Sequence, residues 1–137
     1  MFVERWKRNE EVPDFDGILS AFGDAYEFHH TGLLKCLEAL KPTGWLSVTV
    51  LASLDLYGGK YRVKCGEAAQ HGSIGVIVLE SIVSGDAIWS LVSQDSNPFD
   101  QIEVKAGYVL VLSTSGAVFR FRRELQNVTL SIPKVAT

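Results

Sequence analysis

The segment from Ile74 to Val83 carries apolar side chains at both odd and even positions. Successive side chains of a β-strand point to opposite faces, so a strand that is apolar at both phases has to be covered on both sides. The sequence therefore predicts that this segment is the central strand of the fold. The rest of the chain is expected to cover both faces of this strand.

After Trp45 the apolar positions repeat every two residues, which is typical of half-buried strands. Gly58 and Gly59 tolerate a positive φ and predict the turn of a hairpin, and a second hairpin turn is predicted at 84–86. The connections are too short for crossover helices, so the strands should be antiparallel. The predicted strands cover residues 46–57, 60–66, 74–83, 87–93, 101–104, 108–113, 117–123 and 128–132.

The beginning of the chain has a different period. Its apolar residues recur at helical spacing in two groups, which predicts a short amphipathic helix from Asp14 or Asp16 to Gly23 and a second helix from Thr31 to Lys41. Residues 25–30 alternate as a strand would, but they lie between two predicted helices and receive no assignment. The groups are Phe15, Ile18, Leu19 and Phe22, followed by Leu33, Leu34, Leu37 and Leu40.

These elements specify an α+β fold. One or two N-terminal helices are expected to pack on a mainly antiparallel β-meander of about eight strands, coiled as a barrel or a sandwich. The whole chain, 1–137, is predicted to form a single domain. Within it, 1–13 is an N-terminal arm or edge strand, 14–42 the helical segment and 45–133 the antiparallel sheet.

Composition supports a folded protein in a reducing compartment. The 137 residues are 47% hydrophobic and 21% charged, with a net charge of −3. No apolar run is long enough for a membrane span, and residues 1–8 carry charges where a signal peptide needs its apolar core. We therefore expect a cytoplasmic protein that does not enter a membrane. Cys36 and Cys65 show no metal-binding or redox spacing, so both are expected to be free thiols that pack as small apolar side chains.

Candidate catalytic chemistry is sparse. Glu27, His29 and His30 have the side chains of metal ligands, but adjacent histidines diverge on both strands and helices. His71 or the histidine pair could act as the base for a cysteine nucleophile, but neither cysteine has a suitable setting. No phosphate-binding glycine motif occurs. The sequence thus predicts no metal, no cofactor and no catalytic residue, and it leaves the roles of Glu27, His29, His30 and His71 open.

Two predicted strands carry cations on alternate positions. Lys60, Arg62 and Lys64 share one phase, while Arg120 and Arg122 alternate with phenylalanines. If the two strands were neighbours in one sheet, the five cations would form a patch for carboxylates or phosphates. The alternative is that they only keep the exposed face of each strand soluble.

These features favour a protein-binding module over an enzyme. The five cations Lys60, Arg62, Lys64, Arg120 and Arg122 are the expected contact residues for another protein, as in an inhibitor, antitoxin or immunity-type protein. A small-ligand-binding barrel or sandwich, with or without enzymatic activity, is the first alternative. Nucleic-acid binding through the basic strands is the second, and it is disfavoured because Tyr61, Phe119 and Phe121 occupy the phase opposite the cations. The sequence does not indicate an oligomeric state.

Overall fold

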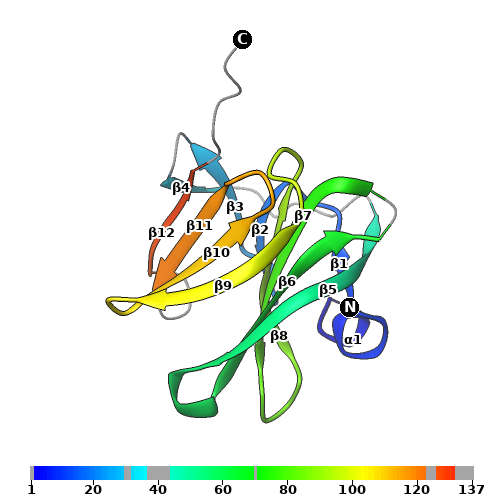
Figure 1. The fold of residues 1–137 in the computed structure, drawn as a ribbon. Helices are drawn as coiled ribbons and strands as arrows, with labels where there is room; N and C mark the ends of the chain where they lie inside the picture. The colour runs from blue at the N-terminus through cyan, green and yellow to red at the C-terminus, as the bar shows by residue number, and fades with distance from the viewer. Residues whose placement is uncertain (1, 30–31, 37–43, 70, 123–125, 132–137) are drawn as a thin grey trace.

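The computed structural model describes residues 2–29, 32–36, 44–69, 71–122 and 126–131. In this part of the chain, twelve strands form two antiparallel sheets of eight and four strands (Figure 1). The larger sheet has the order β1-β5-β6-β7-β8-β2-β3-β4 and the smaller β12-β11-β10-β9. The elements are α1 (Phe2–Asn9), β1 (Glu11–Pro13), β2 (Gly17–Ser20), β3 (Ala25–His29), β4 (Gly32–Lys35), β5 (Trp45–Leu56), η1 (Tyr57–Gly59), β6 (Tyr61–Ala68), β7 (His71–Ser81), β8 (Ala87–Ser93), β9 (Phe99–Lys105), β10 (Tyr108–Ser113), β11 (Val118–Arg122) and β12 (Gln126–Ser131).

β7 lies inside the larger sheet, between β6 and β8, and all residues from Ile74 to Glu80 are buried. Ile77 and Leu79 belong to one apolar cluster and Val76 and Val78 to another, so the strand is covered on both faces. The prediction of a central, doubly covered strand is confirmed.

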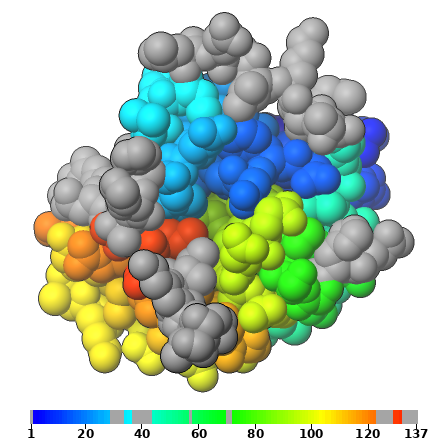
Figure 2. Space-filling view, turned by 90° about the horizontal axis from the view of Figure 1, so that it is seen from above, coloured from blue at the N-terminus to red at the C-terminus, as the bar shows by residue number. Residues whose placement is uncertain are grey.

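The first cluster lies between the two sheets. Val63 and Leu91 of the larger sheet share it with Val109 and Phe119 of the smaller sheet. Edge-to-face aromatic pairs cross this core, with Trp89 5.8 Å from Phe119 and 5.3 Å from Phe121 between ring centroids. The two sheets do not close into one barrel, so the barrel alternative is wrong. Seen from above, the yellow and orange atoms of the smaller sheet lie mostly at the lower left and the green atoms of the larger sheet at the right (Figure 2).

The second cluster lies on the other face of the larger sheet, beneath α1. Phe2 and Trp6 are the buried residues of this helix, and they pack with Val76 and Val78 of β7. A helical layer therefore covers this face as predicted, but residues 2–9 form it and not residues 14–42. The prediction that residues 1–13 form an arm or edge strand is correct only for β1, at residues 11–13.

The two predicted helices are wrong where the structure describes them. β2 pairs with β8 and β3, and β4 pairs with β3. Gly23 does end an element, but as the turn of the β2–β3 hairpin with a φ of 94°, and Phe22 beside it is exposed rather than buried. Over so few residues, helical spacing also fits two short strands joined by a turn. Thr31 and residues 37–41 of the second predicted helix lie outside the described residues.

The meander after Trp45 is confirmed, with eight antiparallel strands from β5 to β12. Gly58 and Gly59 have φ values of 67° and 85°, and Leu56 pairs with Tyr61 across the turn as predicted. The turn at 84–86 likewise joins β7 to β8. Among the described residues, no helix is long and apolar enough to cross a membrane.

Candidate functional site

The five predicted contact cations lie in two groups on opposite sides of the molecule. Val63 and Cys65 of β6 face the core between the sheets, so Arg62 and Lys64 point to the outer face of the larger sheet, the side of α1. Phe119 and Phe121 of β11 face the same core from the smaller sheet. Arg120 and Arg122 therefore point outward on the other side, and the five cations do not form one patch.

Carboxylates of the same chain neutralise the two cations on β6. Arg62 Nε lies 2.7 Å from Asp55 Oδ1 of β5, and this hydrogen bond raises the pKa of the guanidinium. Lys64 Nζ lies 2.9 Å from Glu80 Oε1 and 3.8 Å from Glu10 Oε2. Lys60 is exposed in the turn before β6. Arg62 and Lys64 thus stabilise the outer face of the larger sheet.

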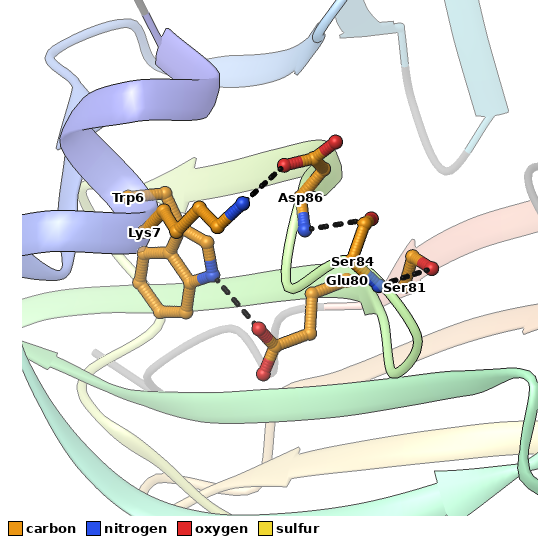
Figure 3. Close-up of polar contacts among 6 residues, drawn as sticks. All are labelled: Trp6, Lys7, Glu80, Ser81, Ser84 and Asp86. Carbon is orange, nitrogen blue, oxygen red and sulfur yellow. Dashed lines mark hydrogen bonds and ion pairs between the residues drawn. The ribbon is translucent and has the colours of Figure 1, made fainter.

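Glu80 is a buried carboxylate beneath α1 (Figure 3). The Trp6 indole Nε1–H donates a hydrogen bond of 3.2 Å to its Oε2, and Lys64 approaches Oε1 from the adjacent strand. The Lys64 contact is an ion pair, since no described donor makes a well-directed hydrogen bond to Oε1. A buried carboxylate needs such partners because desolvation penalises its charge.

A second, exposed contact joins α1 to the β7–β8 turn (Figure 3). Lys7 Nζ lies 3.5 Å from Asp86 Oδ1, and the Asp86 amide donates to Ser84 Oγ at 3.2 Å. Together with Glu80, these contacts fix the orientation of α1. We interpret this cluster as structural, because the carboxylate is enclosed by the residues that neutralise it.

The outer face of the smaller sheet carries a different combination of side chains. Arg120 lies 4.6 Å and Arg122 5.8 Å from the Tyr108 ring centroid, measured from each guanidinium carbon. Half-buried apolar residues continue the same face, with Leu110 opposite Arg120 and Leu112 opposite Val118. We call this surface the Tyr108 face, made of Tyr108, Leu110, Leu112, Val118, Arg120 and Arg122.

The two arginines of the Tyr108 face lack carboxylate partners. Within the described residues, no carboxylate lies within 4 Å of either guanidinium, and the buried Nε of Arg120 has no hydrogen-bond partner. Six other cations of the described chain do have such ion pairs. They are Arg5, Lys7, Lys35, Arg62, Lys64 and Lys105.

Sequence reasoning found the two arginines but missed Tyr108. The available signal was the alternation of Tyr108, Leu110 and Leu112, which places the tyrosine in the outward phase of β10. Phe119 and Phe121, considered as stacking groups for bases, are fully buried in the core and have no surface for a ligand. Tyr61 is half-buried and packs against the same core.

The other candidate residues do not assemble into a described reactive site. Cys36 and Cys65 are unpaired, and burial raises the pKa of the Cys65 thiol to about 12. Among the side chains that the structure describes, no three of His, Cys, Asp and Glu could hold a metal ion. The side chains of His29, His30 and His71 lie outside the described set.

An acidic region surrounds Asp16. Partial burial raises the pKa of this carboxyl, and the charges of Asp95, Glu27 and Asp14 raise it further. The Gln94 amide opposes these effects by donating a hydrogen bond of 3.2 Å to Asp16 Oδ1. Glu27 is therefore close enough to Asp16 for its charge to act on that carboxyl.

Comparison with family models, with curated proteins and with solved structures gave no match.

Proposed function

We propose that this protein is a protein-binding module that contacts its partner through the Tyr108 face. The observation that carries the proposal is the pair of arginines stacked on Tyr108 without a described carboxylate partner. Tyrosine and arginine are enriched at the centres of protein interfaces, where they supply large contact area and oriented donors. Arg62 and Lys64 are not part of this proposal, because Asp55 and Glu80 already neutralise them.

The chemistry of this surface specifies the chemistry of the partner. Arginine binds a carboxylate through two parallel hydrogen bonds, so the partner should present Asp or Glu side chains opposite Arg120 and Arg122. Leu110, Leu112 and Val118 are half-buried beside them and would pack against apolar residues of the partner.

Single-stranded nucleic acid is the second candidate ligand. It is supported by the position of Tyr108, which shares a face with two arginines and could stack a base. The net charge of −3 and the small number of cations on the face favour the protein partner.

A capture experiment with matched charge reversals tests the proposal. The bait proteins would be wild type, Arg122→Glu, and Lys60→Glu as a control with the same charge change on an exposed residue away from the Tyr108 face. We expect a protein captured by wild type and Lys60→Glu to be lost with Arg122→Glu. With the purified partner, Arg122→Glu should slow association roughly tenfold at low salt, because complementary charge acts mainly on the association rate.

Two results would contradict the protein-binding function. Equal capture by all three baits would exclude the Tyr108 face as the contact surface. Capture that disappears after nuclease treatment would identify nucleic acid as the ligand. Thermal melting of the three proteins checks that lost capture does not reflect unfolding, since substitution of an exposed residue changes stability by about 0.5 kcal/mol or less.

A further inference from the structure

One edge of β5 has no described strand partner along most of its length. β1 pairs only with residues from Trp45 to Ser47, and the Val48 amide adds one more hydrogen bond, to the Glu10 carbonyl. From residue 49 to residue 56, β6 is the only described strand that pairs with β5. The β5–β6 hairpin projects from the lower side of the molecule (Figure 1). Backbone groups on such an edge are a template for another strand.

Apart from a bulge between Val50 and Ala52 and the charge of Asp55, this edge lacks the features that usually prevent strand pairing. β1 is three residues long and ends in Pro13, and the edge strand β9 carries Asp100, Glu103 and Lys105. In contrast, residues 49–54 of β5 have no charge and no proline. Leu51 and Leu54 in this stretch are 46% and 36% exposed. In this stretch β5 therefore lacks the protection that β1 and β9 have against pairing.

We infer that the open edge of β5 pairs antiparallel with β5 of a second copy of this chain. A β-bulge between Val50 and Ala52 bends the strand, so we place the pairing in the regular part that follows it. A register centred on Leu54 sets Leu54 opposite Leu54 of the second copy. The same register sets Ser53 opposite Asp55 of the second copy.

Self-pairing suits this strand better than pairing with an unrelated segment. An antiparallel pair of identical strands has a two-fold axis, so each copy uses the same surface. In this register no like charges are opposed, and each Asp55 stays on the outer face, where Arg62 already contacts it. One short strand is a small contact, so association should appear at high protein concentration. The inference does not depend on the Tyr108 face, which lies on the other sheet.

Charge substitutions at Ser53 test both the dimer and its register. Sedimentation velocity would be measured over a wide concentration range for wild type, Ser53→Asp and Ser53→Lys. Ser53→Asp places a carboxylate opposite Asp55 of the second copy at two symmetric positions, and it should weaken dimerisation roughly tenfold. Ser53→Lys places an ammonium there, and dimerisation should be unchanged or tighter.

The position of Lys64 separates this effect from a change in folding. Ser53 of β5 lies directly opposite Lys64 of β6. An aspartate at position 53 would face this ammonium, so it should preserve or raise the melting temperature of the monomer. A loss of dimer in Ser53→Asp without a lower melting temperature supports the inference. A wild-type protein that is monomeric at all concentrations would overturn it. So would equal dimer affinities of the Asp and Lys variants.

Discussion

At the scale of single residues, the two cysteines show how position determines reactivity. Cys65 lies on β6 in the core between the sheets and is 1% exposed. Burial disfavours the charged thiolate, which raises the pKa of Cys65 from its ordinary 9.0 to about 12. Cys36 follows β4 and is half-buried, so it keeps some access to solvent. Since the thiolate is the reactive form, the two side chains should behave differently.

We predict that iodoacetamide labels Cys36 in the native protein near pH 8 and labels Cys65 only after unfolding. The thiol count in denaturant should be two with or without reductant, because neither cysteine is in a disulfide. Mass spectrometry of the labelled peptides measures both. Rapid native labelling of Cys65 would contradict its burial.

The same pKa shift makes stability depend on alkaline pH. The pKa of Cys65 is higher in the folded state, so its contribution to stability is complete below about pH 9 and decreases as the pH rises toward 12. The reason is that the unfolded chain loses the thiol proton first. Urea unfolding of wild type and Cys65→Ala at several pH values checks this, since the variant should lose less stability over that range.

At the scale of elements, α1 depends on the sheet for its structure. A helix of eight residues is unstable alone in water, and here Phe2 and Trp6 are its buried residues. Trp6 also donates its indole proton to Glu80, which anchors the helix at one point on β7. Residues 2–9 are therefore stabilised as a helix by packing on the apolar outer face of β7 and β8.

We predict that Glu80→Gln destabilises the protein by about 1–3 kcal/mol, because it removes the charge that neutralises Lys64. Side-chain exposure is 24% for Lys64 and 8% for Glu80, so the loss should be smaller than for a fully buried pair. Asp86→Asn is the matched control. It breaks the exposed contact with Lys7 and should cost less than about 1 kcal/mol. Equal urea midpoints for the two variants would contradict this account.

At the scale of the whole molecule, the two sheets are held together by one apolar core. Phe119 of the smaller sheet is fully buried and contacts Trp89 of the larger sheet and Phe28 of β3 edge to face. Neither sheet can bury this face without the other. The protein should therefore unfold as one cooperative unit.

We predict that Phe119→Ala lowers the free energy of unfolding by about 3–5 kcal/mol through the lost packing and the resulting cavity. Phe22→Ala makes the same chemical change at a side chain that is 91% exposed, and it should have an effect below about 0.5 kcal/mol. Thermal and urea unfolding of both variants measure the difference. A small effect of Phe119→Ala would mean that the two sheets are not stabilised by a shared core.

The sequence by itself determined the order of the elements after Trp45 and the central position of β7. These features depend on local patterns, which are the two-residue alternation, the apolar run at both phases and the glycines at 58 and 59. The alternation also placed Arg120 and Arg122 correctly on the outward phase of β11.

Only the tertiary structure decided the identity of the short elements before residue 36 and the assignment of strands to sheets. Segments as short as β2 and β4 have no distinctive period, and pairing with β8 and β3 fixes them as strands. The sequence did not indicate that β6 and β11 belong to different sheets, because a strand's pattern does not identify its distant neighbours. That assignment separates Arg62 and Lys64 from Arg120 and Arg122, and long-range packing places Tyr108 beside the second pair.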